Sequence, residues 1–330
     1  MLLYTVGDTW STSTALSWVN VSDNIDENPQ LTLDDSLVNT SSAGTYTITY
    51  YAEDNAGNVG TLEIQITVSE ENEDPEIITY YASAQGLNGE DLLLELRSIV
   101  NTGITRLSYG DIRYLLHESD RDPNNTDNVL TIYDRQSISG VWTGLSSNDT
   151  YNREHVWPNS RLGVATVENH HINIASDFHN LRAAVVGTNS SRGNKWFDLT
   201  LTTTTYYPGN ADKGDVARII LFMYMAYTGM EIVETITAEQ ENSYLPTGRY
   251  MAKFSVLLTW HLEDPVDDFE RNRNNVIYSY QNNRNPFIDY PEFVESIWGS
   301  IPTSSTSASQ FATLLSSRYQ TYTTYSVSYR

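Results

Sequence analysis

The hydrophobic pattern of this chain changes period once, at an acidic run that contains a proline. Before this run, apolar and polar residues alternate in short stretches such as 45–52 and 62–68, which the turn residues 54–58 separate. A period of two is typical of strands with one buried face. The acidic run, 69–76, has the composition of a linker. The sequence therefore predicts an N-terminal all-β domain and a separate second domain.

The charges divide at the same place. Residues 1–76 contain 14 acids and no Lys or Arg, whereas the remainder carries 28 acids against 19 bases; the formal charge of the whole chain is -23. Phosphate binding needs a cationic surface, so this total argues against a nucleic-acid partner. The concentration of acids in the first quarter weakens that objection for the second domain.

Several classes of protein are excluded. The chain has no cysteine, which rules out a disulfide framework, an iron–sulfur cluster and a thiol nucleophile. No window approaches the about 18 consecutive apolar residues of a membrane helix, so no membrane span is predicted. Residues 1–4 lack the basic and apolar regions of an export signal. They have the pattern of a strand, and we expect the natural N-terminus to lie upstream.

Residues 1–68 are predicted to form an antiparallel β-sandwich in which a hairpin joins 45–52 to 62–68. The segment from Ala43-Gly44-Thr45-Tyr46 to Asp54-Asn55-Ala56-Gly57-Asn58 resembles the bacterial immunoglobulin-like repeats of surface and secreted proteins. The resemblance implies an accessory or spacer module of unknown partner. Solvated loop carboxylates explain Asp23, Asp26 and Asp54 more simply than the alternative, a calcium site.

Beyond the linker the period becomes helical. Helices are predicted at 92–100, 109–118, 213–229, 250–261 and 266–280. Pro265 stands where a proline commonly opens a helix. The last residues, 300–330, are rich in Ser, Thr and Tyr and are predicted to form a tail.

One stretch, Tyr151-Asn152-Arg153-Glu154-His155-Val156-Trp157-Pro158, combines a carboxylate with an imidazole. His155 suits a general base because imidazole titrates near neutral pH. Glu154 offers a hard oxygen of the kind that Mg²⁺ or Ca²⁺ prefers. Adjacent side chains of a strand point to opposite faces, so both reach one site only if the backbone bends or they approach it from different sides. A surface ion pair is the alternative.

A second stretch offers a further pair of groups. If Asn189 begins a helical turn, Asn189 and Arg192 share a face. That face would offer an amide oxygen to a hard metal and a guanidinium to a phosphate. The alternatives are a helix N-cap for Asn189 and a salt bridge for Arg192.

These motifs together are similar to the bacterial endonuclease I family, extracellular or periplasmic nucleases with a ββα-metal (His-Me finger) site. The similarity covers about residues 78–299 in order, and its central motifs are Asn152-Arg153-Glu154-His155-Val156-Trp157-Pro158, Asp177-x-His179-Asn180-Leu181-Arg182 and Asn189-Ser190-Ser191-Arg192-Gly193-Asn194. Two features depart from the family: Ala183 stands where proline is usual, and the basic content is low. We expect little consequence from Ala183.

The resemblance implies an α+β fold for 77–299, a His-Me finger nuclease domain with surrounding helices. His155 would deprotonate the attacking water, while Glu154 and Asn189 would hold one divalent ion, Mg²⁺, with Mn²⁺ or Ca²⁺ as alternatives. The substrate would be DNA or RNA, cut with little sequence preference to 5′-phosphate products. The family and the immunoglobulin-like module imply an extracellular or cell-surface location.

The remaining candidates have supporting roles. Arg192 is the second catalytic candidate, through a phosphate contact, and Arg153, Arg182 and Arg284 are weaker candidates for the same task. Asp177, His179 and Asn180 are predicted to form a hydrogen-bonded scaffold under the site, with a direct catalytic role for His179 as the alternative.

Two other functions compete with this interpretation. A zinc peptidase does not fit, because Tyr151 stands where the inverted motif needs histidine and no His-Glu-x-x-His occurs. The other is a non-catalytic acidic adhesin or matrix protein, which the immunoglobulin-like module and the acidity favour.

Overall fold

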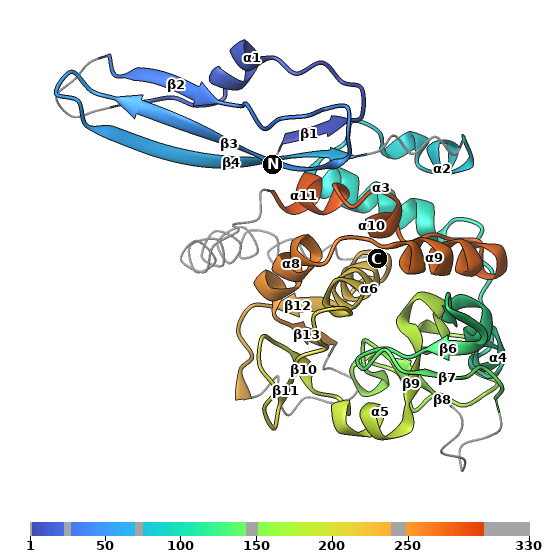
Figure 1. Ribbon diagram of the computed structural model, residues 1–330. Helices are drawn as coiled ribbons and strands as arrows, with labels where there is room; N and C mark the ends of the chain where they lie inside the picture. Colours follow the sequence, from blue (N-terminus) through green and yellow to red (C-terminus); the bar gives the residue numbers. More distant parts are fainter. Residues whose placement is uncertain (1, 23–27, 70–74, 143–150, 239–248, 300–330) are drawn as a thin grey trace, which may run out of the picture. The chain divides into compact units, whose positions relative to one another are not determined.

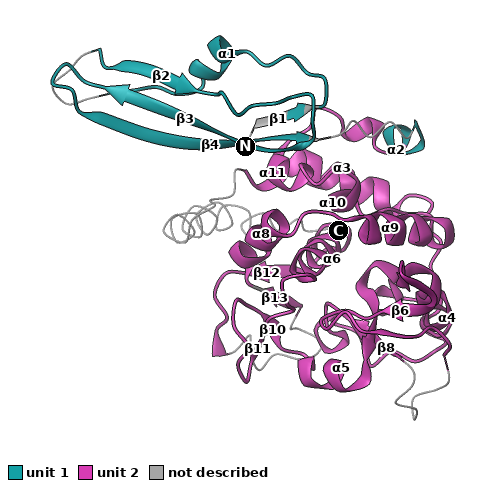
Figure 2. Cartoon of the chain, in the orientation of Figure 1, with its two compact units in different colours: residues 1–79 teal, residues 80–330 magenta. Residues whose placement is uncertain are grey.

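The computed structural model describes residues 2–22, 28–69, 75–142, 151–238 and 249–299. The chain divides into two compact units, 1–79 and 80–330 (Figure 2). The predicted tail, 300–330, lies outside the described residues, as do Asp23 and Asp26 of the considered calcium site. Pro75 and Glu76, which end the predicted linker, begin a short helix, α2.

The first unit is built on a four-stranded sheet of order β1-β4-β3-β2 (Figure 1). Its elements are β1 (Leu2–Thr5), α1 (Thr12–Leu16), β2 (Gln30–Asp34), β3 (Gly44–Glu53) and β4 (Val59–Ser69), and the boundary between the units falls within α2 (Pro75–Tyr80). The predicted hairpin is confirmed as the antiparallel pair β3–β4. In its turn, the Asp54 carboxylate accepts hydrogen bonds from the N–H groups of Ala56 (2.9 Å) and Asn58 (2.8 Å). This carboxylate therefore closes the turn.

The core of the first unit lies on one face of this sheet. Ile48, Tyr50 and Ile66 are buried there, and Trp10 and Trp18 pack against them from the segments that flank α1. The Tyr50 hydroxyl donates to the carbonyl of Ala15 in α1 (2.8 Å). The β framework is as predicted, but the described strands of this unit form one sheet. Where a sandwich has its second sheet, α1 and its flanking segments cover the core.

The second unit is α+β, as predicted. Its helices are α3 (Gly89–Asn101), α4 (Tyr109–Ser119), α5 (Val186–Arg192), α6 (Lys213–Ala226), α8 (Phe254–Glu263), α9 (Asp268–Gln281), α10 (Pro286–Asp289) and α11 (Phe293–Trp298). Short 3-10 turns are η1 (Ala82–Ala84), η2 (Asn159–Arg161), η3 (Ile174–Ser176) and η4 (Phe178–Asn180). The strands are β5 (Arg121–Asp122), β6 (Asn125–Leu130), β7 (Ser137–Ser139), β8 (Tyr151–His155), β9 (Leu181–Val185), β10 (Trp196–Phe197), β11 (Thr205–Tyr206), β12 (Glu231–Val233) and β13 (Tyr250–Ala252).

The predicted helices are present, but several of their ends differ. Helix α3 begins at Gly89, before the predicted start at residue 92, and α6 ends at Ala226, before the predicted end at residue 229. The starts of the last two predicted helices differ as well. Tyr250–Ala252 forms β13, paired in parallel with β12, so that α8 begins only at Phe254. Helix α9 begins at Asp268, because the Asp267 side chain caps it by accepting from the N–H of Glu270 (2.9 Å). Pro265 therefore lies outside that helix.

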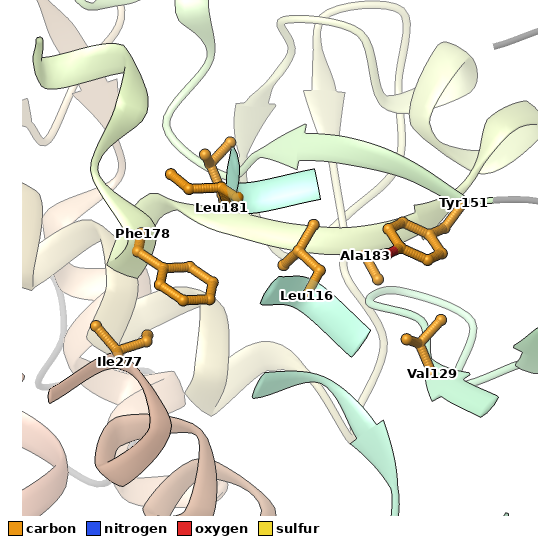
Figure 3. Close-up of a cluster of buried hydrophobic side chains, with 8 residues drawn as sticks. Leu116, Val129, Tyr151, Phe178, Leu181, Ala183 and Ile277 are labelled. Carbon is orange, nitrogen blue, oxygen red and sulfur yellow. The ribbon is translucent and has the colours of Figure 1, made fainter. Parts of the chain in front are cut away.

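The strand pair β8–β9 is anchored by a hydrophobic cluster between α4 and α9 (Figure 3). Leu181 and Ala183 are two residues apart on β9 and so point to one face of the strand, and both belong to the cluster that contains Leu116 and Phe178. Because a shift of one residue would turn these side chains out of the core, the cluster fixes the register of the pair.

In the described part of the chain, no helix has the length and apolarity to cross a membrane.

Candidate active site

Two strands and a helix bring the predicted site residues together. In the antiparallel pair β8–β9, Glu154 lies opposite Arg182, and His155 lies opposite Leu181. Helix α5 follows β9 directly and packs against both strands (Figure 1). Gly193 ends α5 with a φ of +57°, a backbone conformation that favours glycine. The result is a strand–strand–helix unit that carries the Glu-His motif and the Asn189 motif on neighbouring elements.

Glu154 is held firmly by one of its two oxygens. Its side chain is buried, and Oε1 accepts hydrogen bonds from the Tyr133 hydroxyl (2.7 Å) and from Arg192 Nη1 (3.0 Å). No described side chain donates to Oε2 at hydrogen-bond distance. Burial raises the pKa of Glu154, while the charge of Arg192 opposes this shift and favours the carboxylate.

His155 is oriented through its ring nitrogen Nε2. This atom lies 2.7 Å from the carbonyl oxygen of Ala175. Because a carbonyl can only accept, Nε2 carries the hydrogen, and Nδ1 is the acceptor of the neutral ring. The imidazole stacks on Tyr109 with the ring centroids 5.3 Å apart. Burial lowers the pKa of His155 to about 4, so the ring is neutral at pH 7.

Glu154, His155 and Asn189 line one open pocket of about 530 Å³. A second pocket of about 670 Å³ shares Arg153 and Asn189 with the first. His155 is the last residue of β8. The chain leaves the strand there, so two adjacent side chains can reach the same pocket.

The two residues of α5 have different surroundings. Asn189 is half-buried and lies inside the helix rather than at its start, where the sequence placed it. Arg192 is fully buried and lines neither pocket. Besides Glu154, it binds the carbonyls of His155 (3.0 Å) and Val156 (2.6 Å). Both residues lie in α5 three positions apart, as predicted, but only Asn189 lines the pockets, and Arg192 forms the salt bridge that was its alternative.

The three weaker arginine candidates are separated in space. Arg153 lines both pockets, where its guanidinium lies 3.5 Å from the centroid of the Tyr109 ring. Arg182 is buried in ion pairs with two carboxylates, and Arg284 is paired with Asp289 (2.7 Å). Of these three, only Arg153 is placed to meet a phosphate in the pockets.

The predicted scaffold residues make buried hydrogen bonds. Asp177 accepts from Gln281 Nε2 (3.0 Å) and from the Tyr227 hydroxyl (2.5 Å), and His179 Nε2 lies 3.3 Å from the carbonyl of Asn283. The side chain of Asn180 binds both the N–H (2.7 Å) and the carbonyl (3.0 Å) of Trp157. Asn180 therefore fixes the chain two residues beyond His155.

Sequence reasoning missed three neighbours of the site, namely Tyr109, Tyr133 and Ala175. Each comes from a separate segment, and neither a tyrosine nor a backbone carbonyl has a spacing that marks it in advance. Ala183, which stands where the family usually has proline, donates its N–H to Asp120 Oδ2 (2.7 Å). A proline at this position could not make that hydrogen bond.

Among the described residues, no three His, Asp or Glu side chains form a group that could hold a metal ion. The pocket offers a cation the oxygens of Glu154 and Asn189 instead. Carboxylate and amide oxygens suit a hard divalent cation, which keeps water in its other positions.

Comparison with known proteins covers both units. Residues 88–212 and 200–292 match the family Endonuclease I, and residues 2–68 match the family Bacterial surface protein, Ig-like domain. The chain is 41% identical over 234 residues to the extracellular ribonuclease of Bacillus subtilis (strain 168), which covers 67% of this chain and 78% of that protein. It is 39% identical, with the same coverage, to the extracellular ribonuclease of Bacillus amyloliquefaciens. These matches confirm both resemblances that the motifs indicated.

Proposed function

The chain belongs to the endonuclease I family of phosphodiester hydrolases, and from this premise we propose that it is a secreted, metal-dependent endonuclease. It cleaves RNA and DNA with little sequence preference and leaves 5′-phosphates. The observation that carries this proposal is the orientation of His155 beside Glu154 and Asn189 in one pocket.

His155 acts as the general base. The Ala175 carbonyl holds Nε2–H, which leaves the lone pair of Nδ1 to take a proton from the attacking water. The stacked Tyr109 ring fixes the plane of the imidazole. A base with a pKa near 4 is weak, but a phosphate anion in the pocket favours the imidazolium and so raises the pKa of His155 when substrate is bound.

Glu154 and Asn189 would hold the divalent cation, Mg²⁺, with Mn²⁺ or Ca²⁺ as alternatives. A cation held there would neutralise negative charge that develops on the phosphate and on the leaving 3′-oxygen. Glu154 fits this role because Arg192 and Tyr133 engage its Oε1 and not its Oε2. Arg192 acts here by positioning Glu154.

The relatives' names support the choice of substrate and location. Both are extracellular ribonucleases, so we assign RNA as a substrate and the outside of the cell as the place of action. Arg153, at the border of the two pockets, binds a phosphate that flanks the cut.

The test uses RNA and plasmid DNA with Mg²⁺, with and without EDTA. The parent protein should cut both, and EDTA should abolish cutting. His155→Ala should lose about 10²–10⁴-fold in rate, the contribution of a general base. The control His117→Ala changes a histidine that lines neither pocket and should retain activity. Intact nucleic acid in every tube would favour the alternative, an acidic adhesin.

A further inference from the structure

The six-residue turn 131–136, between β6 and β7, contains two residues with unusual backbone angles. Tyr133 has a φ of +81° and Arg135 a φ of +48°. This left-handed region is rarely populated by bulky residues. Each such residue costs about 1–3 kcal/mol and persists only where its surroundings hold it. Contacts with the rest of the unit are therefore needed to stabilise this backbone conformation.

Hydrogen bonds attach the turn to its surroundings. The N–H of Ile132 donates to the carbonyl of Ala183 in β9 (2.9 Å). The N–H of Tyr133 donates to Asp212 Oδ2 (2.8 Å), and Arg135 pairs with the same carboxylate (2.6 Å). The turn is thus fixed to β9 and to the residue that precedes α6.

From this fixed turn, Tyr133 reaches Glu154. Its ring packs against Tyr206 with the centroids 5.1 Å apart, and its hydroxyl donates to Glu154 Oε1 (2.7 Å). Arg192 binds the same oxygen from α5. Two donors on one oxygen restrict the rotation of the carboxylate. The phenol adds no charge, so its removal alters the orientation of Glu154 rather than its electrostatic pairing.

The next residue of the turn reaches α5. Asp134 Oδ2 accepts a hydrogen bond from the Thr188 hydroxyl (2.6 Å). Thr188 directly precedes Asn189. One turn therefore contacts both the Glu154 side chain and the part of α5 that carries Asn189.

We propose that the 131–136 turn sets the relative position of the two cation ligands, with Tyr133 positioning Glu154 and Asp134 positioning Asn189 through Thr188. The inference rests on the proposed function, which assigns Glu154 and Asn189 as ligands. Ligands held in place before the cation arrives lose less conformational freedom when it binds. Partners that orient a ligand typically change metal affinity by about 10–100-fold when they are lost.

The test measures binding of Mn²⁺ to the full chain by electron paramagnetic resonance, without nucleic acid. Tyr133→Phe removes only the hydroxyl, and Thr188→Val removes only the contact to Asp134. Each should raise the Mn²⁺ dissociation constant by about tenfold or more. Tyr206→Phe is the matched control, because it removes a hydroxyl from the ring packed on Tyr133 and should leave the constant unchanged. Saturating Mn²⁺ should restore nuclease activity to both variants.

Glu154→Gln and Asn189→Ala distinguish the positioning role of the turn from the assignment of Glu154 and Asn189 as cation ligands. If these two weaken Mn²⁺ binding while Tyr133→Phe and Thr188→Val do not, the positioning role is wrong and the proposed function stands. If neither Glu154→Gln nor Asn189→Ala changes the constant, the ligand assignment is wrong and the positioning role falls with it. Should Tyr133→Phe not fold, Thr188→Val decides: weaker binding supports the proposal, and parental binding overturns it.

Discussion

Replacing Arg192 by alanine removes a fully buried guanidinium next to the pocket. Glu154 is 3% exposed, and of the two described side-chain donors to its Oε1 the Tyr133 hydroxyl remains. The carbonyls of His155 and Val156 lose a donor. Removing one partner of a buried ion pair costs about 3–5 kcal/mol. At about 2–4 °C per kcal/mol for a domain of this size, the Tm of the nuclease unit should fall by about 6–20 °C.

Scanning calorimetry of the full chain measures this change, and the transition that shifts identifies the nuclease unit. The double variant Glu154→Gln/Arg192→Met should recover much of the lost stability, because it leaves no unpaired charge in the interior. Arg153→Ala is the control. Its guanidinium lies over Tyr109 at the pockets and donates to the Tyr109 carbonyl and to Asn169 Oδ1 (3.1 Å). Among the described residues it pairs with no carboxylate at salt-bridge distance, so we expect a much smaller shift.

A stable but inactive Arg192→Ala variant would contradict the structural role of Arg192. In that case the Tm of Arg192→Ala would stay within about 2 °C of the parent, a change of about 1 kcal/mol or less in stability. Its kcat/KM would fall by about 100-fold or more, a loss of at least about 2.7 kcal/mol in transition-state stabilisation. Arg192 would then act on the transition state. The catalytic role that the sequence suggested would then be right.

Two further predictions concern stability. Burial, followed by the charge of Asp215, raises the pKa of Asp212 to about 7. The stability that protonated Asp212 contributes to the folded state is therefore complete below the unfolded-state pKa of about 4. This stability is lost as the pH rises through about 7. Asp212→Asn should flatten this part of the Tm profile between about pH 4 and 8, and a profile parallel to that of the parent would contradict the assignment. Ala183→Pro should destabilise the nuclease unit by about 1.5–3 kcal/mol, because the N–H that binds Asp120 is lost; an unchanged urea midpoint would show that this hydrogen bond adds nothing.

The sequence alone determined the elements that local pattern controls. Alternation in 45–52 and 62–68 predicted the hairpin β3–β4, and helical spacing predicted α3, α4 and α6. The Glu154-His155 pair and Asn189 were found for a related reason. They stand on β8 and α5, the first strand and the helix of one strand–strand–helix unit, so their motifs occur in a fixed order along the chain.

The tertiary structure alone decided what each charged side chain does. Arg153, Arg182, Arg192 and Arg284 were all phosphate candidates in the sequence. Of these four, only Arg153 lines the two pockets at the site, and the other three are buried in ion pairs. Tyr133 reaches Glu154 from a turn that no motif marks. Burial and pairing depend on which distant segments pack together, and a long side chain on a short element can turn either into the interior or toward solvent. That choice is fixed only when the core forms.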